Sequence, residues 1–456
     1  MQWAGKRVAL LGLGRSNLAM ARYLAKQGAE LVALDVKSPQ ELGDAYRQLQ
    51  TLTQVEFHLG DGYRDYLMGS DAIFVSPGIK KHMPELLRAQ AQGSLITTEI
   101  AYFLERCPAP VLGITGSSGK TTTTTLVGKI LEQSAQCPVY VGGNIGTVLI
   151  EEVDDIPSQA IVVLELSSFQ LQMVRKSPCW AGLTNVRPNH LDIHRDYQEY
   201  QEAKANIFRF QTGGDWLVFN EDDDLVRRLA QEAPGKSCPF SRRKVLPRGA
   251  CVVDDKLVYV EEGGMRPVLS VKDLRLRGWH NVENALAAVA LTTLVGVDPE
   301  DIAQVLSTFV GVEHRLEEVG CHRGVAYIND SIATTHDRTL AALEAMPPGV
   351  LLIAGGYDKR LSFEQLPAAM RGKVRVLLTL GNTAPLIEAE VRRRLPEGEQ
   401  PEILRCSHLE EAVERASYIA KAGETVLLSP ACASFDMFRN YEERGYCFKQ
   451  LVNNLS

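Results

Sequence analysis

Residues 111–125 read VLGITGSSGKTTTTT, and this stretch decides the expected fold of the chain. An apolar strand leads into a turn that contains Gly116 and Gly119, and Lys120 followed by five threonines opens a predicted helix. Backbone N–H groups in a glycine turn, a lysine charge and a helix N-terminus together form a cradle for a polyphosphate. The stretch therefore predicts an ATP-binding loop between a strand and a helix of an α/β domain.

The hydroxyl that follows the lysine, on Thr121, is the usual magnesium ligand in such loops. The strict G-x-x-x-x-G-K-[ST] spacing requires glycine at position 114, where this chain has Ile114. The alternative interpretation is a glycine turn capped by threonines, but the flanking strand and helix favour phosphate binding. We expect the phosphates to contact Gly116, Ser117, Ser118, Gly119, Lys120, Thr121 and Thr122.

Composition limits the class of protein. The 456 residues are 45% hydrophobic and 23% charged, which is typical of a soluble protein with two to four domains. A net charge of −7 argues against a general nucleic-acid binder. The apolar helix candidate at 285–297 is too short to cross a bilayer, and the N-terminus carries no signal-peptide pattern. Nine scattered cysteines without a CxxC pair favour reduced thiols, so we expect a cytoplasmic protein without membrane insertion.

Strands alternate with helical stretches almost throughout, which predicts α/β domains with mostly parallel sheets. We expect three domains: a Rossmann-like domain at 1–103, a central P-loop ATPase-type domain at 104–309 and a second Rossmann-like domain at 310–456. The later part of the central domain, 215–276, is rich in turns and short predicted strands. A helix predicted at about 281–294 ends the domain. The charged runs 221–224 and 392–394 are interpreted as solvated surface.

Two motifs in the first block lie where ligands usually bind. Gly12 and Gly14 follow a strand and Asp35 closes the next strand, as in a dinucleotide fingerprint, although Asn17 replaces the third glycine. A plain tight turn is the alternative. Residues 76–79, SPGI, follow another apolar strand, where a simple turn is again the alternative.

Polar residues also follow strands in the central block. Glu165 ends an apolar strand beside the phosphate loop, where a magnesium ligand or a residue that orients water is needed. His190 lies in NHLD after a strand predicted at 182–186, and a metal ligand and a structural histidine are equally compatible with that place. Lys204 lies in a helical stretch where most lysines are solvated. Asn281 and Asn284 open the alanine-rich helix, where they could cap the helix or read a base edge.

In the third block, several polar loops end predicted strands. They contain His314-Arg315, Asn329-Asp330-Ser331, Asp358-Lys359 and residues 429–436, SPACASFD. Each could be an ordinary loop, but together they indicate a shared ligand-binding face.

Taken together, these motifs resemble the Mur ligase superfamily over nearly the whole chain. In family order they are LGLGRS, SPGI, TGSSGKTT, GGNIG, ELSSFQL, PNHLDIH, AKANIF, HNVENALAA, HR, NDSIATT, GGYDK and LLSPACASFD. ELSSFQL and SPACASFD are specific to the branch that adds glutamate to UDP-N-acetylmuramoyl-L-alanine in peptidoglycan synthesis. The resemblance implies an ATP-dependent ligase with an N-terminal domain for the UDP group, a central ATPase and a C-terminal domain that closes over the amino acid.

The resemblance also implies roles for single residues. The UDP-linked substrate would contact Gly14, Arg15, Ser16, Asp35, Ser76, Gly78, Asn144 and His190. Adenine, ribose or phosphate would contact Asn281, Asn284, Arg315 and Asp330. Glutamate would contact Thr334, Lys359, Ser434, Phe435 and Tyr441. Lys120, Glu165, His190 and Lys204 would be catalytic. Two magnesium ions would be held by Thr121, Glu165, His190 and Lys204, the last as a carbamylated lysine.

Two positions depart from the family pattern: Ile332 replaces the usual lysine of NDSKAT, and Asn189 replaces a frequent aspartate. A branch of the family adds L-glutamate, so D- and L-glutamate both stay open, with D-glutamate as the main prediction. A monomer is expected. Outside the branch, the alternatives are a nicotinamide-dependent dehydrogenase, a P-loop kinase or ATP-driven switch, and a folylpolyglutamate synthase.

Overall fold

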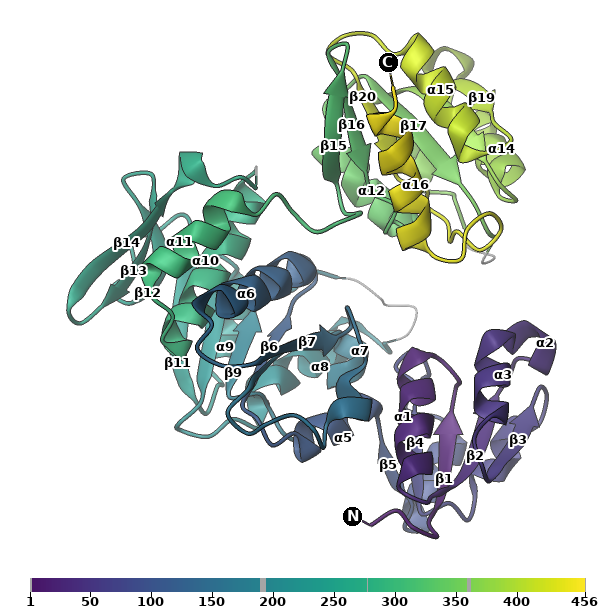
Figure 1. Ribbon diagram of the computed structural model, residues 1–456, viewed down its shortest axis with the longest axis vertical. Coiled ribbons are helices and arrows are strands. Elements are labelled where there is room, and N and C mark those ends of the chain that lie inside the picture. The colour runs from purple at the N-terminus through teal and green to yellow at the C-terminus, as the bar shows by residue number, and fades with distance from the viewer. Residues whose placement is uncertain (1, 189–193, 277, 359–361, 456) are drawn as a thin grey trace. The chain divides into compact units, whose positions relative to one another are not determined.

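The computed structural model describes residues 2–188, 194–276, 278–358 and 362–455, and it contains three β-sheets flanked by helices (Figure 1). The chain divides into two compact units, Met1–Phe309 with the first two sheets and Val310–Ser456 with the third. Three α/β domains were predicted, and the structure contains three helix-flanked sheets, which confirms this part of the prediction. The boundary predicted at residues 103/104 stays a prediction.

The first sheet has five parallel strands in the order β3-β2-β1-β4-β5. Its strands are short apolar runs that are buried on both faces at the centre, which is the pattern of a parallel sheet covered by helices. The strands are β1 (Arg7–Leu11), β2 (Glu30–Asp35), β3 (Val55–Leu59), β4 (Ala72–Val75) and β5 (Leu95–Thr97). The helices are α1 (Arg15–Lys26), α2 (Pro39–Leu42), α3 (Asp44–Gln50), η1 (Tyr63–Leu67), α4 (Pro84–Ala91) and α5 (Glu99–Arg106).

The second sheet has nine strands in the order β14-β13-β12-β11-β10-β9-β6-β8-β7. The pairs from β7 to β12 are parallel, and only β12-β13 and β13-β14 are antiparallel, which confirms a β-rich extension of a parallel sheet. The strands are β6 (Val111–Thr115), β7 (Val139–Gly143), β8 (Ile161–Glu165), β9 (Trp180–Leu183), β10 (Trp216–Asn220), β11 (Lys236–Ser241), β12 (Gly249–Val253), β13 (Lys256–Glu261) and β14 (Gly264–Ser270).

Helices cover this sheet, and α6, α8 and α10 carry several of the predicted site residues. Helix α10, predicted at 281–294, is buried along most of its length and packs against α6. The helices are α6 (Lys120–Ser134), η2 (Leu149–Glu152), α7 (Ser168–Leu171), α8 (Tyr197–Arg209), α9 (Asp224–Ala230), η3 (Val271–Asp273), α10 (Trp279–Val295) and α11 (Pro299–Thr308).

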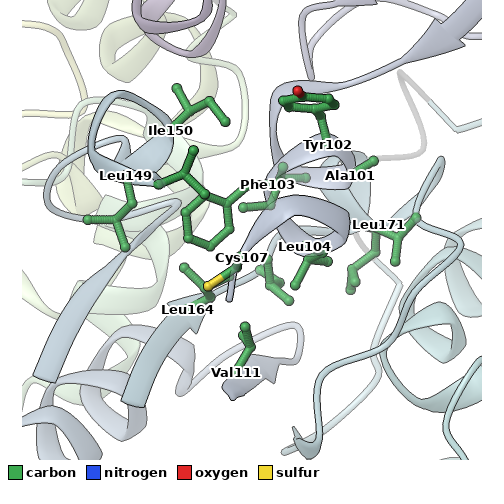
Figure 2. Close-up of a cluster of buried hydrophobic side chains, with 14 of the residues drawn as sticks. Ala101, Tyr102, Phe103, Leu104, Cys107, Val111, Leu149, Ile150, Leu164 and Leu171 are labelled. Atoms are coloured by element: carbon green, nitrogen blue, oxygen red, sulfur yellow. The ribbon is translucent and has the colours of Figure 1, made fainter. Parts of the chain in front are cut away.

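One hydrophobic core joins the first two sheets. It contains Leu10 of β1 and Leu164 of β8, and α5 lies between them in the chain. Figure 2 shows Phe103 and Leu104 of α5 in one cluster with Leu149 of η2, Leu164 of β8 and Leu171 of α7. The boundary predicted at 103/104 therefore falls inside a helix whose side chains belong to this shared core.

The third sheet, in the second unit, has the order β15-β16-β20-β17-β18-β19, with only β15 antiparallel. The strands are β15 (Glu317–His322), β16 (Val325–Asn329), β17 (Val350–Gly355), β18 (Val374–Leu380), β19 (Glu402–Arg405) and β20 (Thr425–Leu428). The helices are α12 (His336–Ala345), α13 (Leu366–Met370), α14 (Ala384–Arg394), η4 (Glu397–Glu399), α15 (Leu409–Ile419) and α16 (Tyr441–Asn453). Polar loops after β16, β17 and β20 therefore lie at the carboxyl edge of neighbouring parallel strands.

Two local predictions were wrong. The strand predicted at 182–186 ends earlier, as β9 at Leu183, so the next residues are free to leave the sheet. In the charged run 221–224, Asp223 is buried, caps α9 through Leu225 N and Val226 N, and pairs with Arg187. The helix needs an acceptor at its N-terminus, and this requirement overrides the preference of a carboxylate for water. In the part of the chain that the structure describes, no helix has the length and apolar character to cross a membrane.

Candidate active site

The turn between β6 and α6 requires glycine at two positions. A Cβ on Gly116 would lie 2.0 Å from Thr184 Oγ1, and a Cβ on Gly119 would lie 2.3 Å from Asn284 Oδ1. Gly119 also has a φ of +80°, which favours glycine. Ile114 lies upstream of the turn, buried in β6, so the departure from the strict motif leaves the loop itself intact.

Lys120 is the first residue of α6, and its side chain folds over the loop. Its Nζ donates to Gly116 O at 2.8 Å and to Ser117 O at 3.3 Å. Thr121 and Thr122 follow in the first turn of α6. Backbone N–H groups at a helix N-terminus have no acceptor within the helix and favour the binding of an anion. The lysine charge and the helix end therefore converge on the mouth of the same loop.

Sequence reasoning missed the residues that hold this loop from outside. Asn185 accepts from Ser118 N through its side-chain oxygen at 2.9 Å and from Ser117 N through its backbone carbonyl at 2.9 Å. The Ser117 hydroxyl also lies 2.8 Å from the Tyr200 hydroxyl. Asn185 lies beside the loop because β9, the strand next to β6, ends at Leu183, and the sequence pattern did not indicate this end.

Glu165 ends β8 next to the phosphate loop, as predicted. Asn144 donates its side-chain amide to Glu165 Oε1 at 2.7 Å. The second oxygen, Oε2, is buried and has no hydrogen-bond partner. A buried carboxylate oxygen without a partner is costly unless a cation or donor completes it, so this residue fits a magnesium ligand.

Lys204 is buried, although the helical spacing alone indicated a solvated lysine. Its side chain on α8 is 1% exposed, and Nζ donates to Gly116 O at 2.8 Å and to Thr115 Oγ1 at 3.3 Å. Burial and the Lys120 charge hold the pKa of Lys204 well below its ordinary value, while Glu165 opposes them. The site therefore favours a neutral, nucleophilic amine.

His190 and Lys359 lie outside the described residues, so their predicted roles stay predictions. Among the side chains that the structure does describe, no three His, Cys, Asp or Glu residues gather as a ready-made metal cluster. His194, just after the undescribed segment 189–193, is anchored. Its Nε2 lies 3.0 Å from Ser168 Oγ, and its ring stacks on Phe169.

Of the predicted UDP-binding residues, six lie on the turn after β1 or at the ends of the neighbouring strands β2 and β4, whereas Asn144 lies beside Glu165. Asp35 Oδ2 accepts from Leu13 N at 2.8 Å, and a Cβ on Gly14 would lie 3.4 Å from Ser76 Oγ. Asn17, at the place of the third glycine, donates to three carbonyl oxygens and so braces the turn. Arg15 and Ser16 open α1, and Gly78 lies in the exposed loop after β4.

Asn281 and Asn284 lie inside α10, beyond its N-cap Gly278, rather than capping it. Asn284 Nδ2 donates to Asn281 Oδ1 at 3.1 Å, and Thr123 donates to Asn284 Oδ1 at 3.4 Å. Asn284 therefore lies against the phosphate loop, and Asn281 is held beside Asn284.

In the second unit, Asp330 follows β16 and is buried. It accepts from Ser429 Oγ at 2.7 Å and from Leu316 N at 3.2 Å. Burial raises its pKa to about 7, against the opposing effect of the Ser429 bond. Arg315, the other residue predicted here for the nucleotide, precedes Leu316 and has its own partners.

Among the predicted glutamate-binding residues that the structure describes, Thr334, Ser434 and Phe435 lie on loops that follow parallel strands, and Tyr441 opens α16. Ser434 is buried and Phe435 is 62% exposed, with its ring 5.9 Å from that of Tyr357. The backbone carbonyl of Tyr441 accepts from Ser331 Oγ at 2.8 Å. Thr334 is half-buried in the loop after β16. Thr334, Ser434, Phe435 and Tyr441 therefore share one edge of the third sheet.

Three domains of the Mur ligase family match the chain in succession. The MurD-like N-terminal domain of Mur ligases matches residues 6–98, and the Mur ligase middle domain matches residues 114–292. The Mur ligase glutamate ligase domain matches residues 314–432. The chain belongs to the Mur ligase family. Membership implies ATP-dependent ligation, typically with Mg²⁺.

Curated relatives match this Mur ligase over nearly its full length. A UDP-N-acetylmuramoylalanine–D-glutamate ligase of Symbiobacterium thermophilum is 48% identical over 99% of this chain and 98% of its own. A protein of the same name from Acetivibrio thermocellus is 44% identical over 99% of this chain and 97% of its own.

Solved structures share the fold of this Mur ligase. The UDP-N-acetylmuramate–alanine ligase of Thermotoga maritima aligns over 98% of this chain and 100% of its own, with a TM-score of 0.57 and 19% identity. MurF of Acinetobacter baumannii aligns over 99% of this chain and 94% of its own, with a TM-score of 0.57 and 17% identity. At such identities the likeness concerns the fold alone.

Proposed function

We propose that this Mur ligase joins D-glutamate to UDP-N-acetylmuramoyl-L-alanine in an ATP-dependent step of peptidoglycan precursor synthesis. The full-length relatives carry the name of this activity at 41–48% identity. The observation that carries the proposal is the convergence of Lys120, Lys204 and Glu165 on one phosphate loop.

The reaction needs an activated carboxyl group. A carboxylate does not condense with an amine in water, because its charge makes the carbon unreactive and hydroxide is a poor leaving group. A carboxylate oxygen of the alanine end attacks the γ-phosphorus, the bond to the β–γ bridging oxygen breaks, and ADP leaves. The glutamate amine then attacks the acyl carbon, the carbon–oxygen bond to phosphate breaks, and an amine proton passes to solvent.

Phosphoryl transfer of this kind depends on position and on neutralisation of oxygen charge. Lys120 and the N–H groups of the first turn of α6 bind and orient the phosphates. Thr121, Glu165 and Lys204, with His190, would hold magnesium, which supplies positive charge to the phosphate oxygens. Two ions are proposed. The buried, unpartnered Oε2 of Glu165 supports this assignment.

A carbamylated Lys204 is part of the proposal. A neutral lysine amine captures CO₂ to form a carbamate, with loss of a proton. The product is an anionic oxygen ligand, which an unmodified lysine cannot provide. The burial of Lys204 beside Lys120 supports the neutral amine that this step requires.

The substrates are assigned to separate loops. The UDP part is proposed to bind Gly14, Arg15, Ser16, Asp35, Ser76 and Gly78, with Asn144 and His190 toward the alanine end. The nucleotide is proposed to contact Asn281, Asn284, Arg315 and Asp330. Glutamate is proposed to contact Thr334, Lys359, Ser434, Phe435 and Tyr441.

We further propose that the enzyme acts as a monomer in the cytoplasm. All nine cysteines are unpaired thiols, which suits a reducing compartment.

The test is phosphate release from ATP with UDP-N-acetylmuramoyl-L-alanine and either D- or L-glutamate. We expect release only when both co-substrates are present, and only with D-glutamate. Phosphate release with L-glutamate but not with D-glutamate would assign the enzyme to the branch that adds L-glutamate. Release without the UDP-linked substrate would indicate a different P-loop enzyme, and a nicotinamide cofactor requirement would indicate a dehydrogenase.

A further inference from the structure

Arg444, on α16, is a charged side chain that the proposed mechanism does not use. It is completely buried in the second unit, at 0% exposure. A guanidinium that is removed from water loses much hydration energy, so its burial needs compensating contacts.

The contacts of Arg444 join two loops that follow parallel strands. Nε and Nη2 donate to the Ser331 hydroxyl and carbonyl oxygens, at 3.0 and 2.9 Å, in the loop after β16. Nη2 also donates to Cys432 O at 3.1 Å, and Nη1 donates to Ala433 O at 3.3 Å, in the loop after β20. The planar, forked guanidinium therefore fixes one loop against the other.

A third loop, after β17, packs against the same group. A Cβ on Gly356 would lie 3.4 Å from Arg444 Nη1 and 2.3 Å from Ala433 O. The next residue, Tyr357, donates its backbone N–H to Ala433 O at 2.9 Å. Three strand-end loops therefore meet at this one side chain.

The loops that Arg444 holds carry the residues proposed for glutamate. The Ala433 carbonyl belongs to the same peptide group as Ser434 N. The Ser331 hydroxyl, which accepts from Arg444, donates in turn to Tyr441 O. A shift of the guanidinium would therefore move both Ser434 and Tyr441.

The charge of Arg444 is not neutralised by a hydrogen-bonded carboxylate in these contacts, since every acceptor is a hydroxyl or carbonyl oxygen. Asp330 and Asp436 act on it only through space. Burial lowers its pKa to about 10, so it stays charged at neutral pH. A fixed positive charge under these loops favours a ligand that brings negative charge, as glutamate does with two carboxylates.

We propose that Arg444 is a positioning residue for the incoming amino acid: it locks the loops after β16 and β20 together and biases the site toward a dianionic ligand. The inference rests on the proposed function, because it assumes that these loops bind glutamate. It assigns Arg444 no contact with the reacting atoms.

The test compares Arg444→Met, Arg444→Lys and wild type in steady-state kinetics with each substrate varied in turn. Arg444→Met should raise the KM for glutamate about tenfold or more, since it removes charged hydrogen bonds. The KM values for ATP and the UDP-linked substrate should change less than about twofold. Arg444→Lys keeps the charge but not the forked geometry, so its KM for glutamate should lie between those of wild type and Arg444→Met. Arg439→Met is the matched control, because that side chain is 89% exposed.

Thermal unfolding checks that each variant is folded. If Arg444→Met does not fold, the Ser331→Ala variant tests the inference instead. It removes the hydroxyl that accepts from Arg444 and donates to Tyr441 O. We expect it to raise the KM for glutamate several-fold. An unchanged glutamate KM, or an equal rise for all three substrates, would overturn the inference. If wild type itself forms no amide, the proposed function fails instead.

Discussion

Asn144 holds one carboxylate oxygen of Glu165 at 2.7 Å and leaves the other buried without a partner. The amide donor orients the carboxylate. The backbone also holds the two residues together, since Asn144 N donates to Glu165 O at 2.8 Å and the preceding Gly143 pairs with Glu165 across β7 and β8. This geometry leaves a single defined oxygen for a cation. Asn144 therefore acts on Glu165 in addition to its proposed contact with the UDP-linked substrate.

Removing that donor should weaken magnesium binding. We expect Asn144→Ala to raise the Mg²⁺ concentration for half-maximal turnover by about 10–100-fold, the usual effect of losing a group that orients a metal ligand. Glu165→Gln should lower turnover further, because it removes the anionic ligand. The measurement is turnover against Mg²⁺ at saturating ATP, with the exposed Glu202→Gln as control. An unchanged Mg²⁺ dependence in Asn144→Ala would contradict this role of the amide.

The function of Lys204 should be restored by a small added carboxylic acid rather than by another side chain. We expect Lys204→Ala to abolish turnover and a small carboxylic acid such as acetate to restore part of it, because acetate supplies an anionic oxygen in the vacated space. Lys129→Ala, on the exposed face of α6, is the control and should behave as wild type in both conditions. Full activity of Lys204→Ala without acetate would rule out the carbamate.

The sequence predicted what is encoded locally. The phosphate loop and Glu165 could be read because strand, turn and helix follow one another within a few residues. The burial of Lys204 could not be predicted, because it depends on α8 packing against a loop 88 residues away. The same reason hides Asn185, 67 residues from Ser118, and Arg444, 113 residues from Ser331. Strand order, such as β6 between β8 and β9, is likewise a long-range property.

Glu99 should make stability depend on pH. Burial raises the pKa of its carboxyl to about 8 from the ordinary value of 4.5. Between these values the folded state keeps a proton that the unfolded state has lost, so stability falls as pH rises, by at most about 1.4 kcal/mol per pH unit. Above about pH 8 this effect levels off. Removing the ionisable group should therefore flatten the profile.

The variant that tests this is Glu99→Gln, measured by urea unfolding at about pH 5, 6.5 and 8. The free energy of unfolding of Glu99→Gln should increase relative to that of wild type as the pH rises through that range. Glu105→Gln, on the exposed side of the same helix, is the matched control. Parallel profiles for Glu99→Gln and wild type would show that the carboxyl is not held protonated.

Phe103 should be needed for the stability of the first unit. It is fully buried in the core shared by the first two sheets (Figure 2). We expect Phe103→Ala to lower the free energy of unfolding by about 3–5 kcal/mol, through lost burial and a residual cavity. Leu87→Ala, at a position 54% exposed on α4, should change it by less than about 0.5 kcal/mol. Equal effects would show that α5 does not join the two sheets.

The central claim is that ATP makes the alanine carboxyl electrophilic, and oxygen labelling tests it most directly. The UDP-linked substrate is prepared with ¹⁸O in that carboxylate and turned over with ATP and D-glutamate, and the released phosphate is analysed by mass. The proposed mechanism predicts one ¹⁸O atom in each phosphate, carried across when the carbon–oxygen bond breaks. Amide product accompanied by unlabelled phosphate would contradict it.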